Sequence, residues 1–210
     1  MNSPEPCVDL ACRSRLASAR SLSGPKLTEP PGGVLVWLIV GLEMVTFGIG
    51  LAVFLRMKVA EPMVFRAGRE GLHWEFALVN TLFLITGGWV MANAQHRLRE
   101  GDPRGAGRYM VFAIAFGMAF LVGKGIEYAA KINQGMGLHH DSFHTIYWLL
   151  TGFHYVHVIV AVVLLAAMAW GLGRPGGAGA RLENVESSAV FWHMCDLIWL
   201  FLMPIIYLLP

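Results

Sequence analysis

The sequence predicts an all-α integral membrane protein whose chain crosses the bilayer five times as helices. The chain has 210 residues, of which 56% are hydrophobic and only 14% are charged, whereas about a quarter of the residues of a soluble domain are charged. The apolar residues gather in five long blocks, and each block has the roughly 20 residues that a helix needs to cross a bilayer. These blocks do not alternate apolar and polar residues as the strands of a membrane barrel do, so we expect a helical bundle.

The first 33 residues precede the first apolar block and are rich in Ser, Pro and Arg. They lack the apolar segment of a secretory signal peptide, so we expect a disordered cytoplasmic tail. Residues 34–210 are expected to form one membrane domain without an internal repeat. Its predicted helices cover about residues 34–55, 76–95, 109–130, 146–172 and 189–209.

The basic residues predict how the chain is oriented, because Lys and Arg prefer the cytoplasmic side of short loops. With the N-terminus inside the cell, the inner segments hold ten Lys and Arg residues and the outer loops hold five. The five outer ones are Arg56, Lys58, Arg66, Arg69 and Lys131. This bias predicts a cytoplasmic N-terminus and a periplasmic C-terminus, and it places the histidine-rich loop 139–144 outside.

Charged residues inside the predicted helices are costly, by about 2.5–3.5 kcal/mol for a centred Asp, Lys or Arg, so we expect them to face the bundle interior and to pair. Glu43, about halfway along the first helix, is either a proton-titrating or lipid-linked carboxylate or a neutral acid that bonds a neighbouring helix. Lys124 and Glu127 lie three residues apart, share a helix face and can pair. Their position near the outer end of the helix also allows Lys124 to snorkel toward the interface.

Three intramembrane histidines are candidate ligands for haem or a metal. His154 and His157 share a face of the fourth predicted helix, and His193 lies on the fifth. Such residues can ligate a b-type haem, but most intramembrane histidines only bond a neighbouring helix. Asp196 shares a face with His193, so it either orients this histidine or forms a polar contact between helices with it.

The glycines in the helices and the cysteines also allow predictions. Five glycines in the helices are expected to permit close helix contact, namely Gly87, Gly88, Gly117, Gly123 and Gly125. Cys195 lies inside an apolar helix and is expected to behave as a small hydrophobic residue, whereas Cys7 and Cys12 lie in the tail. The sequence contains no CxxC pair, dinucleotide-binding glycine motif or P-loop, so no soluble-enzyme chemistry is indicated.

A series of segments in a fixed order resembles a known family. They read NTLFLITGG at 80–88, EGD at 100–102, KGIEY at 124–128, GFHYVHV at 152–158 and FWHMCDLIWLFL at 191–202. Together they resemble subunit III of the haem–copper oxidases over roughly residues 34–209. The usual mitochondrial member has seven helices, and this chain resembles the last five. Within the family, the five-helix form and the lysine of KGIEY are most similar to an accessory protein of bacterial nitric oxide reductase.

The resemblance implies a non-catalytic accessory subunit in the bacterial inner membrane, with neither a catalytic residue nor a bound metal of its own. Haem, with non-haem iron or copper, would then belong to the partner, which is the catalytic subunit of nitric oxide reductase or, alternatively, of an aerobic cytochrome c oxidase. Phospholipid is a further implied ligand. Glu43 corresponds to the family's membrane acid near a proton-uptake region. The other polar residues are expected to connect helices or contact lipid: Asn80, Thr81, Lys124, Glu127, His154, His157, His193 and Asp196.

Two other functional classes stay open at this point. One is a b-type cytochrome ligated through His154 or His157 and His193. The other is a small transporter or proton channel that uses Glu43, Lys124, Glu127 and Asp196. Transporters often carry inverted repeats and broken helices, and the sequence indicates neither.

Overall fold

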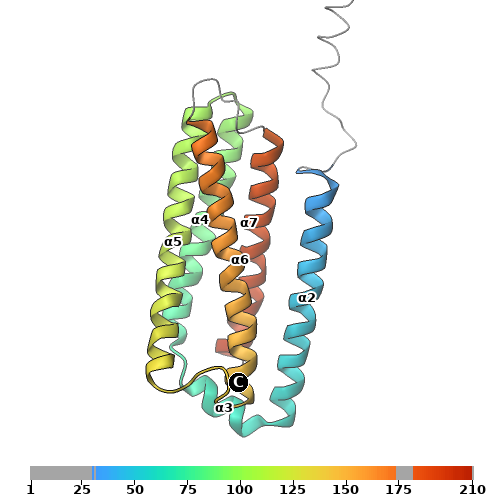
Figure 1. The fold of residues 1–210 in the computed structure, drawn as a ribbon, viewed down its shortest axis with the longest axis vertical. Helices are drawn as coiled ribbons and strands as arrows, with labels where there is room; N and C mark the ends of the chain where they lie inside the picture. Colours follow the sequence, from blue (N-terminus) through green and yellow to red (C-terminus); the bar gives the residue numbers. More distant parts are fainter. Residues whose placement is uncertain (1–29, 31, 174–181, 210) are drawn as a thin grey trace, which may run out of the picture. The chain divides into compact units, whose positions relative to one another are not determined.

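The fold is described from a computed structural model, which describes residues 30, 32–173 and 182–209. In this part of the chain all regular elements are helical, and five helices are long and apolar enough to cross a membrane (Figure 1). They are α2 (Gly33–Ala60), α4 (Trp74–Arg99), α5 (Pro103–Asn133), α6 (Ser142–Leu172) and α7 (Leu182–Met203), which continues as a π-helical turn, η1 (Pro204–Leu208). The predicted all-α, multi-pass membrane fold is therefore confirmed.

The predicted spans fall on the observed helices, which are longer. The largest shift of a single boundary is at the start of the last helix, which begins at Leu182 rather than near residue 189. A short helix, α3 (Pro62–Glu70), lies between the first two spans, where the sequence predicts an outer loop. Of the predicted tail, residues 1–29 and 31 lie outside the described residues, as do Cys7 and Cys12.

The short helix α3 forms because it has one apolar face to pack. Pro62 begins the helix, where its missing N–H costs nothing. Phe65 packs edge-on against Phe54 of α2 and Phe143 of α6, with ring centroids 5.2 and 5.5 Å apart. This aromatic cluster fixes α3 against the start of α6.

The turns between the long helices have recognisable local chemistry. Asp102 and Asp141 cap α5 and α6, with side-chain oxygens that accept the backbone N–H groups of Gly105 (2.9 Å) and His144 (2.7 Å). Gly101 and Gly135 follow α4 and α5 with φ of +81° and +75°, values that L residues with a side chain rarely adopt. These signals keep the α4–α5 and α5–α6 connections short, so these helices are antiparallel neighbours.

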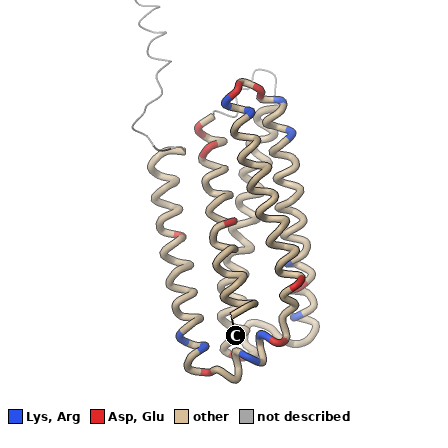
Figure 2. Tube along the Cα trace, turned by 180° about the vertical axis from the view of Figure 1, so that it is seen from behind, with Lys and Arg blue, Asp and Glu red and all other residues tan. Residues whose placement is uncertain are grey.

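Helices α4, α5, α6 and α7 pack around a common core, in which α4 also contacts α7 (Figure 1). Helix α2 packs on the outside of this group, against α6 and α7. Large aromatic side chains fill the core, including Phe120, Trp192 and Trp199. The Lys, Arg, Asp and Glu positions gather at the two ends of the helices, with few between them (Figure 2). That distribution is typical of a bundle whose middle lies in lipid.

The small residues act as the sequence predicted at four of the five positions. At Gly87, Gly88, Gly117 and Gly123, a side chain from a neighbouring helix lies where a Cβ atom would sit. At Gly117 these atoms belong to Trp192 of α7, 2.7 Å away, and Val162 of α6, 2.8 Å away. Gly125 has only an ordinary contact with Tyr155. Cys195 is buried among apolar residues, as expected.

Candidate functional site

The most extensive polar site in the described part of the chain surrounds the ammonium group of Lys124. Its Nζ donates to Glu127 Oε2 (3.1 Å), Tyr147 Oη (3.1 Å) and Tyr207 Oη (2.6 Å). The two tyrosine hydroxyls in turn donate to Glu127 Oε1, at 2.6 and 2.7 Å. All three ammonium donors are therefore used, and both carboxylate oxygens accept. The predicted Lys124–Glu127 pair is present, and two tyrosines complete it.

The expectation that Lys124 snorkels to the interface is wrong. Its side chain is only 1% exposed. Aromatic rings surround the ammonium group, with centroids at 4.9–5.4 Å for Tyr128, Tyr147, Trp199 and Tyr207. A cation attracts the electron-rich face of such rings. With three oxygen acceptors and these rings inside the bundle, the side chain gains more by pointing inward than by reaching for water.

Three helical elements bring this site together. Lys124 and Glu127 come from α5, one turn apart on the same face, and Tyr147 comes from the start of α6. Tyr207 comes from η1, where Pro204 interrupts the α-helical hydrogen bonding and Leu209 N–H donates to Pro204 O five residues back (2.9 Å). The π turn thereby sets the direction in which Tyr207 points.

A pocket of about 200 Å³ reaches this site from one end of the bundle. Its lining includes Glu127 and Lys131 of α5, together with His73 and Phe76 at the start of α4. Lys131 donates to Gly71 O at 3.4 Å and lies over the Tyr147 ring at 5.5 Å. Glu127 is therefore the member of the site that is closest to being accessible.

A second intramembrane pair joins α2 to α6. Glu43 Oε2 lies 3.3 Å from His157 Nε2, although the two atoms are not aligned as a hydrogen bond. His157 Nδ1 lies 2.8 Å from the carbonyl oxygen of Phe153, which can only accept, so Nδ1 carries a proton. The facing Nε2 and carboxyl oxygen join α2 to α6 at membrane depth.

His154 lies one turn from His157 but in a different environment. It is fully buried, and neither ring nitrogen has a hydrogen-bond partner. Its ring stacks on Trp199 with centroids 5.3 Å apart and meets Phe120 edge-on at 5.9 Å. The two histidines share a helix face, as predicted, and both meet Phe47 edge-on, but His154 stacks on Trp199 whereas His157 lies against Glu43.

The last helix carries the predicted contact between His193 and Asp196. His193 Nδ1 lies 3.5 Å from Asp196 Oδ2, and the carboxylate sits against Gly88 of α4, where a side chain would collide with it. The other oxygen, Oδ1, is buried without a hydrogen-bond partner. The pair thus lies where α7 meets α4.

Asn80 and Thr81 lie on the buried face of α4. Thr81 Oγ1 accepts from Trp199 Nε1 at 2.9 Å and donates to the carbonyl of Ala77 at 2.8 Å. Asn80 lies against Gly123 of α5. Through Trp199, Thr81 connects α4 to the ring that lies over Lys124. These contacts join helices, and whether either residue also contacts lipid stays a prediction.

Sequence reasoning missed Tyr147 and Tyr207. Both lie in apolar stretches, where a tyrosine reads as an interfacial or core aromatic residue. A buried lysine needs three acceptors and its paired glutamate supplies only some of them, so the lysine itself was the signal that hydroxyl groups were required nearby. The partner of Glu43 was likewise not predicted, because nothing in the sequence places α2 against α6.

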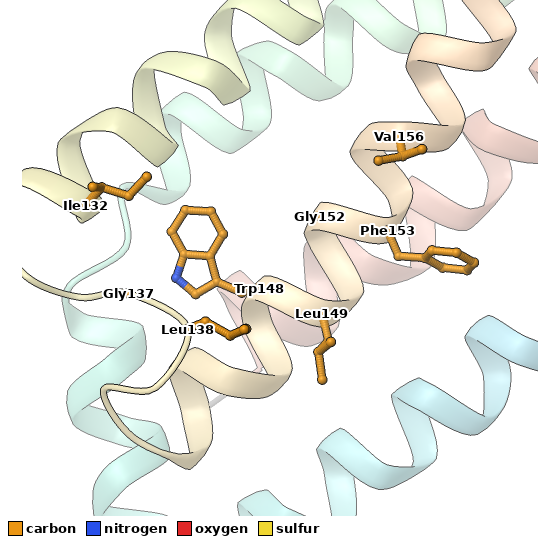
Figure 3. A pocket seen from close by; sticks show the side chains of 8 residues that line it. All are labelled: Ile132, Gly137, Leu138, Trp148, Leu149, Gly152, Phe153 and Val156. Atoms are coloured by element: carbon orange, nitrogen blue, oxygen red, sulfur yellow. The ribbon is translucent and has the colours of Figure 1, made fainter.

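An apolar groove of about 530 Å³ lies on the outer surface of α6, near the end of α5 (Figure 3). Trp148 borders it, with its Nε1 donating to Met136 O at 3.0 Å, so the ring is held in place. The groove is lined by Ile132, Gly137, Leu138, Trp148, Leu149, Gly152, Phe153 and Val156. No titratable side chain lines it, so it offers binding space but no chemistry.

Comparison with known proteins gives this architecture a family. The sequence profile described as cytochrome c oxidase subunit III matches residues 69–209. Cytochrome c oxidase subunit 3 of Thermostichus vulcanus is 30% identical over 178 residues, which cover 84% of this chain and 86% of that protein. Its counterpart in Synechocystis is 32% identical over 132 residues, covering 62% of this chain and 55% of that protein.

A subunit of a different oxidase also matches. Subunit 3 of the cytochrome bo(3) ubiquinol oxidase of Pseudomonas putida is 24% identical over 143 residues, which cover 68% of this chain and 69% of that protein. Residues 69–209, which the family profile matches, include all of α4 to α7 and therefore the site around Lys124. The chain belongs to the cytochrome c oxidase subunit III family.

Proposed function

We propose that this chain is the non-catalytic subunit III of a haem–copper terminal oxidase in a bacterial inner membrane, where it stabilises the catalytic subunit and supports its proton uptake. The observation that carries the proposal is the near full-length similarity to a cytochrome c oxidase subunit 3, with 86% of that protein covered. The organisms of several relatives are bacteria, which supports the location.

The nitric oxide reductase interpretation now takes second place. The five-helix form and the lysine of KGIEY resemble NorE, the accessory protein of bacterial nitric oxide reductase, but the relatives reported above are named as oxidase subunits. Both interpretations share the same physical role, namely a bundle without redox centres beside a catalytic subunit that holds haem and either copper or non-haem iron. They differ in the partner, so the partner decides between them.

The structure offers surfaces and groups suited to such a role. The polar side chains bond within the bundle, whereas large apolar side chains point outward along α2, as Leu42 and Ile49 do. An apolar outer face can pack against a partner helix or lipid. We propose that the Glu43–His157 pair, which joins α2 to α6 at membrane depth, exchanges protons with the partner. Phospholipid stays a proposed ligand, and we propose that its acyl chain occupies the apolar groove beside Trp148.

The proposal is tested by purifying the tagged full-length chain from membranes in a mild detergent, with absorption spectra and subunit identification on the eluate. Cells are grown with oxygen and, in parallel, with nitrogen oxides. We expect the haems and catalytic subunit of a cytochrome oxidase to copurify, and a colourless chain after the complex is dissociated. Copurification of nitric oxide reductase instead would restore the NorE-type interpretation. Stoichiometric haem on the isolated chain would overturn both and make His154, His157 and His193 ligand candidates again.

A further inference from the structure

A second group of side chains of the kinds that bind metals lies at one end of the bundle, where the loop after α5 enters α6. His140 and Asp141 precede the helix, and His144 lies in its first turn. One ligand atom from each of these residues lies within 4.8 Å of the other two. Among residues 30, 32–173 and 182–209, no other three His, Cys, Asp or Glu side chains come together closely enough to hold a metal ion.

The helix cap arranges the first two ligands. Asp141 Oδ1 accepts from the His144 backbone N–H at 2.7 Å and lies 2.9 Å from His144 Nδ1. Its other oxygen, Oδ2, makes no hydrogen bond in the described structure and lies 4.0 Å from His140 Nε2. Asp141 therefore presents one oxygen toward each of the two histidines.

These distances fit a small tetrahedral ion. Zn²⁺ binds imidazole nitrogen and carboxylate oxygen at about 2.0–2.2 Å, which places neighbouring ligand atoms of a tetrahedral site roughly 3.3–3.6 Å apart. The two contacts of Asp141 lie on either side of that range: Oδ1 is 2.9 Å from His144 Nδ1, and Oδ2 is 4.0 Å from His140 Nε2. One ligand atom from each residue already lies within 4.8 Å of the other two, so side-chain rotations that bring these atoms to the zinc spacing would complete the site.

Burial distinguishes this group from a chance surface cluster. The His144 side chain is only 4% exposed, and its Nε2 has no hydrogen-bond partner. The ring packs edge-on against Phe143, with centroids 5.3 Å apart, which fixes its position. His140 is half exposed, so the site stays open to ions from solution. A rigid buried ligand beside a movable exposed one suits reversible metal binding.

The charged residues around the group favour a cation on balance. Glu61, between α2 and α3, accepts a hydrogen bond from Ser142, the residue after Asp141. This contact adds a second carboxylate near the loop and anchors the start of α6 to α3. Lys131 interacts with Asp141 electrostatically, but its ammonium group is directed to the carbonyl of Gly71.

We propose that His140, Asp141 and His144 form a Zn²⁺ site at the membrane surface, with water as the fourth ligand. Two imidazoles and one carboxylate suit zinc better than the oxygen-seeking ions Mg²⁺ and Ca²⁺. The bound ion would tie the α5–α6 loop to the first turn of α6, one turn before Tyr147. The site is distinct from the polar groups in the membrane and independent of which oxidase or reductase is the partner.

The test uses the purified full-length chain in detergent, freed of metal and carrying an affinity tag without histidine. Zn²⁺ binding is measured by calorimetry, and Co²⁺ is added as a spectroscopic probe whose visible absorption reports tetrahedral coordination. We expect one Zn²⁺ per chain and an intense Co²⁺ spectrum. His140→Ala should weaken binding at least about tenfold, the loss typical even of groups that only support a ligand.

Two further variants keep the test decisive. Asp141→Asn retains the capping oxygen while removing the negative charge, and it should also weaken Zn²⁺ binding. His96→Ala is the matched control, because His96 is an exposed histidine at the other end of the bundle, 3.2 Å from Glu100. This variant should bind Zn²⁺ as the unaltered chain does. Equal affinity in His140→Ala and His96→Ala, or a Co²⁺ spectrum without tetrahedral bands, would overturn the proposal.

Discussion

Lys124 is the residue whose environment departs most from what membrane burial ordinarily allows. An unpaired charge in a low-dielectric interior is strongly unfavourable, and a buried pair is tolerated only when its geometry is good and the remaining polar atoms are bonded. Here Glu127 supplies the opposite charge and Tyr147 and Tyr207 supply the remaining acceptors. All three ammonium donors and both carboxylate oxygens are bonded within this site, so removing one member leaves another without a partner.

Lys124→Met should therefore destabilise the bundle by about 3–5 kcal/mol, because Glu127 is left buried without its cation. The measurement is unfolding of the purified chain in mixed detergent, followed by circular dichroism. The double variant Lys124→Met/Glu127→Leu should lose less than the single one, since no uncompensated charge remains.

The exposed pair Arg66–Glu70 supplies the matched control. Its atoms lie 3.2 Å apart, as close as those of the buried pair, but its side chains are 73% and 62% exposed. Glu70→Gln should cost less than about 1 kcal/mol. If Lys124→Met cost no more than Glu70→Gln, the buried ammonium group would not be charged in the folded bundle.

Glu43 and His157 should behave as one unit, because their facing atoms are 3.3 Å apart. In a double-mutant cycle of Glu43→Gln and His157→Asn, we expect a coupling of about 0.5–3 kcal/mol in the free energy of unfolding. Glu43→Gln combined with His96→Asn is the control cycle, since His96 pairs with Glu100, and it should be additive. Additivity in both cycles would show that the α2–α6 contact contributes nothing as a pair.

At the scale of elements, close helix packing depends on glycine at particular positions. Gly117 has Trp192 and Val162 within 3 Å of where a Cβ would be. Both belong to rigid side chains in the core, so neither can move aside without displacing α6 or α7. Other glycines, such as Gly48 of α2, have nothing within 4 Å of that point. Substitutions at these two kinds of glycine therefore separate the effect of helix packing from the effect of helix propensity.

Gly117→Ala should destabilise the bundle by about 1–3 kcal/mol, the cost of inserting atoms into a filled core. Gly48→Ala should cost nothing, because the added methyl group meets open space and alanine favours helix. Thermal unfolding of the two variants side by side is the measurement. A loss in Gly48→Ala equal to that in Gly117→Ala would contradict the close approach of α5 to α6 and α7.

For the whole molecule, the proposed orientation has a direct consequence for labelling. The end of the bundle that carries Glu100 should face the cytoplasm, and the end that carries Gln134 should face the periplasm. In a chain whose native cysteines are replaced, Gln134→Cys should react with a membrane-impermeant maleimide in intact cells. Glu100→Cys should react only after the cells are broken. The reverse pattern would show that the positive charges of the first outer loop, not those of the inner loops, set the orientation.

The sequence predicted what depends on composition and local spacing. The five spans, the Lys124–Glu127 pair and the His193–Asp196 contact all follow from apolar blocks and from residues three apart on a helix. It did not predict α3, whose stability comes from Phe65 packing between two distant phenylalanines. Nor did it predict the contact of Glu43 with His157, which depends on where α2 docks.

The placement of Tyr207 has a consequence for how the protein is made. Lys124 and Glu127 enter the membrane when the third span is synthesised, well before the ribosome reaches residue 207. Because they lie one turn apart, they can pair within their own helix and cross the insertion machinery as a neutral unit. The tyrosine hydroxyls arrive later, and the second of them comes from the π turn η1 that follows α7. A nascent chain that has not yet folded η1 would thus hold the Lys124–Glu127 pair in the membrane with one of its two tyrosine partners missing.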